Sequence, residues 1–222
     1  MTFVTDKKTM KSTDIIPADL IDLAASKGAC SYALVWLRAA PRTWQELTDY
    51  RTDWLEWAVR NLDLTTLPEG LAVGGSLILF DCHALATFPE GLAVDGYLHL
   101  YHCTALAALP EGLTVGGDLI LRDCPALTAL PEGLAVGRDL YLRDCHALTA
   151  LPEGLTVNGN LDLSGCPALT TIPEGLAVGR DLYLRDCHAL ATIPEGLTVG
   201  GDLILRDCHA LTALPEGLTV NG

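Results

Sequence analysis

The chain has 222 residues, 50% of them hydrophobic, and a formal net charge of −14. This apolar content excludes an intrinsically disordered chain, and the negative charge argues against direct binding to nucleic acid or to an anionic membrane. The longest apolar run, residues 32–37, is too short to cross a bilayer.

Residues 1–15 are polar and are expected to form a flexible N-terminus. They lack the apolar stretch and the small-residue cleavage site of a secretory signal. We therefore predict a cytoplasmic location, where the eight cysteines stay reduced.

Residues 16–61 are predicted to form a helical cap. Pro17 stands near a helix start and Gly28 near a helix end. Thr43 and Glu46 have the spacing of a capping box, and a further helix follows that contains Trp54. We expect two to four short helices that cover the first coil of the repeat region described next, because a terminal coil otherwise exposes its apolar interior.

Residues 62–222 repeat a 21-residue unit. Pro-Glu-Gly recurs every 21 residues from 68–70 to 215–217, and a cysteine follows the same spacing from Cys82 to Cys208. The unit reads PEGL(A/T)VxGxLxLxxCxALxxL, with seven complete copies and the first eight residues of another. This period predicts a solenoid of seven full coils and a partial eighth.

Each unit contains one short strand in this interpretation. In residues 118–122, Leu119 and Leu121 are expected to face inward because the pattern alternates. Proline has no amide hydrogen to donate, so we predict that the return side cannot be a central strand, and 21 residues leave little or no room for a helix on the convex side. We predict an α+β fold, with one short parallel strand per coil and a helical N-terminal cap.

The repeat resembles the leucine-rich repeat, with LxLxxC where that family has LxLxxN or LxLxxC. The LxxLPEGL segment, as in residues 127–134, is similar to the short bacterial type found in secreted effectors and phage-associated proteins. Trp44 and the segment 53–57 resemble helical stretches of phage and bacterial proteins of unknown function. The resemblance implies a horseshoe or gently curved solenoid that binds another protein through its strands. A long C-terminal domain like that of the effector ligases does not follow the repeats, so nothing supports ubiquitin transfer.

Three outward positions of each strand form columns along the solenoid. The first column, before the first strand leucine, is Ser76, Tyr97, Asp118, Asp139, Asn160, Asp181 and Asp202. The middle column, between the two leucines, is Ile78, His99, Ile120, Tyr141, Asp162, Tyr183 and Ile204. The third column, after them, is Phe80, Tyr101, Arg122, Arg143, Ser164, Arg185 and Arg206. Variation among the copies concentrates in these columns.

We predict a non-enzymatic module that binds another protein through these columns. Tyrosine, arginine and isoleucine are suited to anchoring an interface. The predicted partner-binding residues are Tyr97, His99, Tyr101, Asp118, Ile120, Arg122, Asp139, Tyr141, Arg143, Asp162, Asp181, Tyr183 and Arg185. The alternative is that they only solvate the sheet, with weak Asp–Arg pairs.

No metal, cofactor or catalytic residue is predicted. The repeated cysteines lack the CxxC pairs of zinc sites and are expected to be buried thiols. Four histidines follow a cysteine directly: His83, His146, His188 and His209. A catalytic pair also needs hydrogen-bond reach and a third orienting group, so we interpret these histidines as a solvated column.

Acidic residues suggest an alternative function. From residue 68 onward there are 19 acidic and 6 basic residues, a net charge of −13, and a glutamate recurs from Glu69 to Glu216. An acidic DNA mimic that inhibits a nucleic-acid enzyme, encoded by a phage, would carry such charge. The mixed Asp and Arg columns argue against it, and solubility is the ordinary role of the glutamates.

The last complete coil suggests self-association. Its strand would lie at the edge of the sheet, which invites pairing with a second copy. The predicted self-association residues are Asp202, Leu203, Ile204, Leu205 and Arg206. We expect a homodimer through this coil, and a purely structural, self-assembling repeat protein is a further alternative.

Overall fold

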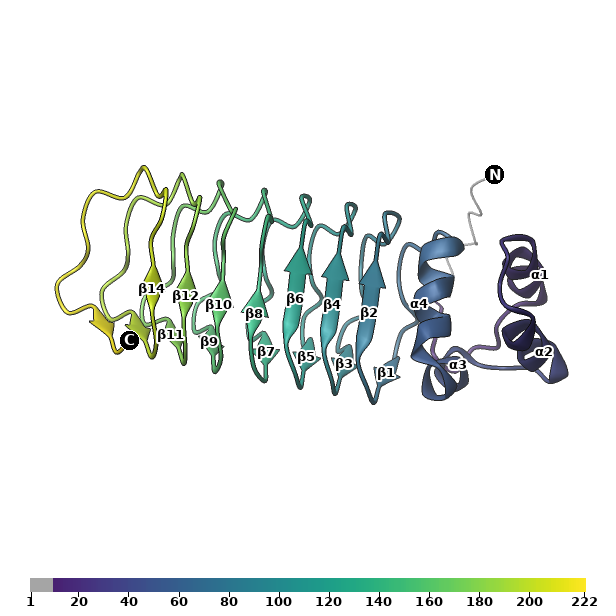
Figure 1. Cartoon of the computed structure of the whole chain (residues 1–222). Helices are drawn as coiled ribbons and strands as arrows, with labels where there is room; N and C mark the ends of the chain where they lie inside the picture. The colour runs from purple at the N-terminus through teal and green to yellow at the C-terminus, as the bar shows by residue number, and fades with distance from the viewer. Residues whose placement is uncertain (1–9) are drawn as a thin grey trace.

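The computed structural model describes residues 10–222 and shows a parallel β-solenoid with four helices at its N-terminal end (Figure 1). The helices are α1 (Ala18–Ser26), α2 (Ser31–Ala39), α3 (Trp44–Tyr50) and α4 (Thr52–Asn61). The coils stack in chain order away from α4. The predicted α+β solenoid with a helical cap is confirmed. Within the described residues, no helix has the length and apolar character needed to cross a bilayer.

Local sequence signals set the ends of the helices. Helix α1 begins directly after Pro17, and Gly28, with a φ of +85°, turns the chain after its end. Helix α3 begins at the predicted capping box. The Thr43 hydroxyl accepts from the Glu46 amide at 3.1 Å, and the Glu46 carboxylate accepts from the Thr43 amide at 2.8 Å.

Helix α4 closes the N-terminal end of the solenoid. Leu55 and Val59 are 0% and 1% exposed and belong to the same apolar cluster as Leu77 of the first coil. Glu56 Oε1 also accepts a hydrogen bond from the Ile78 amide at 2.9 Å. The helix thus supplies both the apolar contact and the hydrogen-bond acceptor that an earlier coil would provide.

The predicted flexible N-terminus divides into two parts. Residues 1–9 lie outside the described residues. From Met10 on the backbone pairs with the first coil: Ser12 N donates to Glu69 O, and Glu69 N donates to Met10 O, each at 2.7 Å. Ile15 forms an antiparallel bridge with Thr43. Residues 10–15 therefore belong to the structured cap, because they add backbone hydrogen bonds at the turn of the first coil.

The predicted strand is present in every complete coil. The seven strands are β2 (Leu77–Phe80), β4 (Leu98–Tyr101), β6 (Leu119–Arg122), β8 (Leu140–Tyr141), β10 (Leu161–Asp162), β12 (Leu182–Tyr183) and β14 (Leu203–Ile204). They form one parallel sheet in which residues 21 apart are partners, as Leu98 and Leu119 are. This register places identical repeat positions side by side.

A second, two-residue strand follows Pro-Glu-Gly-Leu in each coil, so the prediction that the return side cannot be a central strand is wrong. One sheet contains β1 (Ala72–Val73), β3 (Ala93–Val94), β5 (Thr114–Val115) and β7 (Ala135–Val136). The other contains β9 (Thr156–Val157), β11 (Ala177–Val178), β13 (Thr198–Val199) and β15 (Thr219–Val220). Proline removes one donor only, so amides further along remain free: Thr114 N donates to Leu92 O at 3.1 Å.

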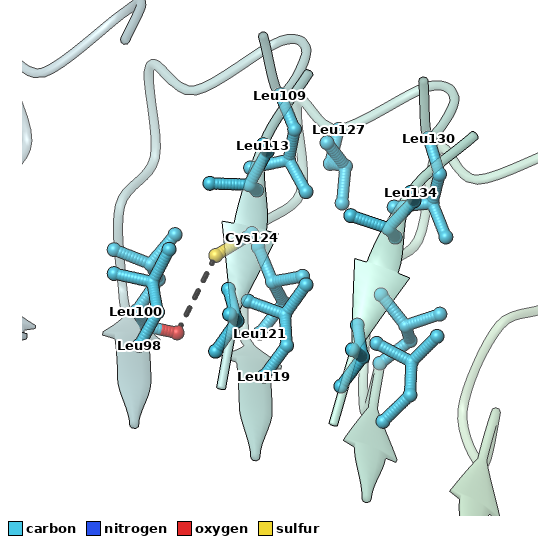
Figure 2. Close-up of a cluster of buried hydrophobic side chains, with 14 of the residues drawn as sticks. Leu98, Leu100, Leu109, Leu113, Leu119, Leu121, Cys124, Leu127, Leu130 and Leu134 are labelled. Carbon is cyan, nitrogen blue, oxygen red and sulfur yellow. Dashed lines mark hydrogen bonds between the residues drawn. The ribbon is translucent and has the colours of Figure 1, made fainter. Parts of the chain in front are cut away.

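The inward side chains form continuous apolar columns through the solenoid (Figure 2). The strand leucines Leu98, Leu100, Leu119 and Leu121 are all 0% exposed. Leu127, from the segment after the corner, is also fully buried. Because each coil contributes the same side chains at the same height, every coil packs against an identical surface on its neighbours.

The corner cysteines add a polar contact to these columns. Cys124 is buried, and its thiol donates to Leu100 O of the preceding coil, with a sulfur–oxygen distance of 3.8 Å (Figure 2). Cys166 makes the same contact to Leu142 O at 3.0 Å. The expectation of buried thiols is confirmed for six of the seven repeat cysteines, and Cys208 is partly exposed. A thiol suits this corner because it is small and apolar yet can donate weakly to a carbonyl.

The residue before each cysteine has a left-handed backbone conformation. Asp123, Asp144 and Asp186 have φ angles of +53°, +57° and +56°, and Gly165 takes this position in the fifth coil with +75°. Aspartate tolerates this conformation better than most other side chains do. This left-handed turn, which is repeated in successive coils, therefore explains why Asp-Cys recurs in the repeat.

The apolar columns predict different costs for two neighbouring residues of β6. Leu121→Ala should lower the free energy of unfolding by about 2–5 kcal/mol, because it leaves a cavity between coils. Ile120→Ala, on the outward side of the same strand, should cost about 1 kcal/mol or less. Urea denaturation followed by circular dichroism measures both. Equal losses for the two variants would contradict the assignment of the inward face.

Candidate protein-binding face

The outward side of the seven-stranded sheet brings the three predicted columns together. We call this surface the strand face: the first, middle and third columns defined above. Register across the strands aligns each column, so that Ile78 lies beside His99 and Phe80 beside Tyr101. Along one strand, residues two apart project on the same side, as Asp139 and Tyr141 do. The predicted partner-binding residues therefore share one surface.

The first column holds the coils together. Its side-chain oxygens accept hydrogen bonds from the backbone amide of the same position on the next coil. Asp118 accepts from Asp139 N at 3.1 Å, Asp139 from Asn160 N at 2.7 Å, and Asp181 from Asp202 N at 2.9 Å. These hydrogen bonds form a ladder along the solenoid, which explains why the first column consists mainly of side chains with an acceptor oxygen. Tyr97 interrupts the ladder. One carboxylate oxygen of Asp118, Asp139 and Asp181 is thus engaged within the solenoid.

The two tyrosines of the middle column are fixed by the same carboxylates. The Tyr141 hydroxyl donates to Asp139 Oδ2 at 2.8 Å, and the Tyr183 hydroxyl donates to Asp181 Oδ2 at 2.9 Å. Burial, together with the hydrogen bond to Asp139, raises the pKa of Tyr141 to about 12. Both rings remain partly exposed. A side chain held in place before binding loses less conformational entropy on contact with a partner.

An aromatic patch covers the strand face nearest the helices. It consists of Ile78, Phe80, Tyr97, His99 and Tyr101. Ile78, Phe80 and Tyr97 are 37%, 39% and 44% exposed. The Phe80 ring contacts His99 and Tyr101 edge-on, with centroid distances of 4.9 Å and 6.1 Å. Burial lowers the pKa of His99, which favours the neutral imidazole. A contiguous apolar surface of this kind is typical of an interaction site.

Two members of the aromatic patch were absent from the predicted site. Ile78 and Phe80 lie on the first coil, and the prediction began at Tyr97. Ile78 belongs to the middle column and Phe80 to the third, so the repeat pattern alone could have included them in the predicted site. Both also line a hollow of about 230 Å³ where β2 meets α4, together with Glu56, Trp57 and neighbouring residues of that helix.

The strand face changes character toward its C-terminal coils. The third column carries four exposed arginines: Arg122, Arg143, Arg185 and Arg206. The fifth coil interrupts this column with Ser164, and Asp162 takes its place in the middle column; the two residues are only 7% and 9% exposed between longer neighbours. Asp162 Oδ1 accepts from the Ser164 amide at 2.9 Å. Asp162 therefore presents little surface to a partner, although it lies in the predicted site.

The cysteine–histidine neighbours face different surroundings. Cys145 is buried among the apolar columns, whereas His146 is exposed. The same holds for Cys187 and His188, and His188 stacks on His209 of the next coil with a centroid distance of 5.2 Å. Across residues 10–222, no group of three or more His, Cys, Asp or Glu side chains is placed to hold a metal ion.

The predicted self-association residues lie at one edge of the seven-stranded sheet. Strand β14 is the last in the sheet order and pairs with β12 only. Leu203, Ile204 and Leu205 are partly exposed, and Asp202 and Arg206 are exposed. An edge of this kind can pair with another strand, and the homodimer through it stays a prediction.

Comparisons with models of known protein families, with curated proteins and with solved structures found no match. The interpretation of the strand face therefore rests on the residues and contacts of this chain.

The Asp139 contacts predict an acid-dependent loss of stability. Burial opposes ionisation, but hydrogen bonds from the Asn160 amide and the Tyr141 hydroxyl hold the pKa of Asp139 below its ordinary value of 3.8. A carboxyl group whose pKa is lower in the folded than in the unfolded chain stabilises the fold. This stabilisation is complete above the pKa of the unfolded state and is lost as the pH falls through the pKa of the folded state. Between pH 5 and about 3, the wild type should therefore lose more stability than Asp139→Asn does.

Urea denaturation at each pH measures this difference. Glu132→Gln, an exposed residue of the same coil, is the matched control and should follow the wild type. A pH dependence that is identical in all three proteins would rule out the Asp139 contacts as its source.

Proposed function

We propose that this protein is a non-enzymatic protein-binding module of the leucine-rich-repeat type and that its partner binds to the strand face. The observation that carries this proposal is the aromatic patch, where Ile78, Phe80 and Tyr97 stay exposed on a sheet whose inward leucines are fully buried. Exposed apolar side chains lower solubility unless a partner covers them. The proposed repeat type is supported by one LxLxxC strand per coil and by the cysteine thiol that bonds the preceding leucine carbonyl.

The aromatic patch would supply the central anchor of the interface. Aromatic side chains contribute much of the binding energy in protein interfaces when they become fully desolvated. Phe80, His99 and Tyr101 already contact one another edge-on, so their rings are ordered before binding. The hollow beside Phe80, along α4, offers room for one side chain of the partner.

The charged part of the strand face would set the orientation of the partner. The exposed arginines of the third column can form paired hydrogen bonds with carboxylates. Arg122 and Arg206 each lie near one aspartate of their own turn, at 3.5 Å and 3.4 Å, which leaves other donors of both guanidiniums free. We expect a partner surface with an apolar centre and acidic residues on one side.

The test is quantitative affinity purification of the partner from a bacterial lysate with three versions of the full chain. Tyr141→Ala with Tyr183→Ala, and separately Phe80→Ala with Tyr97→Ala, should each reduce partner recovery at least about tenfold, since buried anchor residues contribute about 1–2 kcal/mol or more each. Circular dichroism confirms that the variants are folded.

The matched control lies on the short strands that follow Pro-Glu-Gly-Leu. Thr114→Ala with Thr156→Ala changes two exposed residues outside the strand face and should leave recovery unchanged. Equal recovery by the wild type and both strand-face variants would refute the proposed interface.

The exposed glutamates favour a second candidate function, an acidic inhibitor of a nucleic-acid enzyme. All eight glutamates from Glu69 to Glu216 are exposed and recur at each Pro-Glu-Gly turn. A partner bound through them would be lost steeply with added salt and displaced by duplex DNA. A partner bound through the aromatic patch would be insensitive to DNA and only weakly sensitive to salt. The same purification, repeated with salt and with DNA, separates the two.

A further inference from the structure

The helical cap contains a cavity that is partly open to solvent and is separate from the strand face. It has a volume of about 470 Å³ and lies between the pair α1 and α2 and the pair α3 and α4. Its wall includes Leu20 and Ala24 of α1, Ala33 of α2, Leu47 of α3 and Ala58 of α4. Protein interiors rarely retain voids larger than a water molecule. A space of this size falls within the range of small-molecule sites, about 300–1,000 Å³.

Aromatic residues from three of the helices line this cavity. Tyr32, Trp44, Trp54 and Trp57 all line it. The Trp54 ring is fixed by Tyr32 and by Trp36, with centroid distances of 6.0 Å and 5.5 Å, and its Tyr50 neighbour lies at 5.6 Å. A wall held in place by several aromatic contacts is formed before any ligand enters. Such a wall offers ring faces for a flat molecule to pack against.

The two charged residues on the cavity wall neutralise each other. Arg51 Nε and Nη2 donate to the two carboxylate oxygens of Asp53 at 2.8 Å and 2.6 Å. These hydrogen bonds raise the pKa of Arg51 and lower the pKa of Asp53, so both groups stay ionised and paired. Both side chains of this pair are about half exposed, and among residues 10–222 the rest of the lining carries no charged residue. A charged ligand would therefore find no partner deeper in the cavity, which favours a neutral molecule.

We infer that the helical cap binds a neutral, mainly apolar small molecule with one or two aromatic ring systems. The molecule fills the cavity between the two helix pairs and packs against Trp54 and its aromatic neighbours. Filling restores dispersion contacts that the lining side chains lack around an empty space. This inference does not depend on the proposed partner of the strand face.

Cys30 provides a reporter for the cavity. It lines the cavity wall at the start of α2, and its sulfur accepts from the Ala33 amide at 3.4 Å. It is exposed, whereas six of the seven repeat cysteines are buried. A thiol reagent should therefore modify Cys30 faster than the buried cysteines, and a molecule in the cavity should slow that modification.

The probe for the test is N-phenyl-1-naphthylamine, a neutral molecule with two aromatic ring systems, a phenyl and a naphthyl group, whose fluorescence rises in apolar surroundings. The full chain should bind it saturably with one site per chain, and saturating probe should slow the modification of Cys30 at least about threefold. Ala24→Trp, which fills the cavity, should weaken binding at least about tenfold. Ala18→Trp places the same side chain on the exposed side of α1 and should bind like the wild type.

Several outcomes overturn the inference. The absence of saturable binding to the wild type, or equal binding by both tryptophan variants, excludes the cavity as the site. An unchanged rate of Cys30 modification at saturating probe also excludes the cavity as the site. This measurement uses the wild type alone, so it remains valid if Ala24→Trp fails to fold. Probe binding that dissociates a dimer in light scattering would assign the cavity to a second copy of the chain instead.

Discussion

The contact between successive coils is the interaction on which the whole molecule depends. A 21-residue coil has too little interior to be stable alone, so its leucine, valine and cysteine side chains are buried only against the same side chains of the next coil. The strand leucines Leu98, Leu119 and Leu140 are all 0% exposed in one column. Constant spacing keeps these columns aligned, and an insertion would break them. The helices of the cap and the pairing of Met10 with Glu69 complete the same arrangement at its N-terminal end.

This requirement divides the repeat into fixed and variable positions. Inward side chains vary little and stay apolar, because each packs against the same repeat position of the neighbouring coils. The first column of the strand face is also restricted, since Asp118, Asp139 and Asp181 accept backbone hydrogen bonds from the next coil. Side chains of the middle and third columns are largely free of core packing and of hydrogen bonds to the next coil. These columns carry the aromatic patch at one end and the arginines toward the other, and we therefore place the proposed partner there.

Much of the fold could be predicted from the sequence because a repeat shows directly which positions packing fixes. The strand in residues 118–122, the inward leucines and the capping box at Thr43 follow from local patterns that the structure confirms. The second strand pairing contradicts the prediction based on the missing amide hydrogen of proline, because the amides that pair lie further along the coil than the proline. The backbone hydrogen bonds of the first column join residues 21 apart and have no local pattern. The signal was that six of its seven members are Ser, Asp or Asn. The cavity of the cap has no periodic signature, since it arises from how four helices pack together.

Deletion of one whole coil tests the stacking of interchangeable coils most directly. Removal of residues 131–151 joins Leu130 to Pro152 and keeps every later side chain in phase. If the coils are interchangeable, this shorter chain should have the circular dichroism spectrum of a solenoid and should unfold cooperatively in urea. Removal of residues 131–150, one residue fewer, shifts the phase at the junction and should lower the unfolding midpoint well below that of the in-phase deletion. Equal urea midpoints for the two deletion variants, or an in-phase variant that does not fold, would contradict the stacking of interchangeable coils.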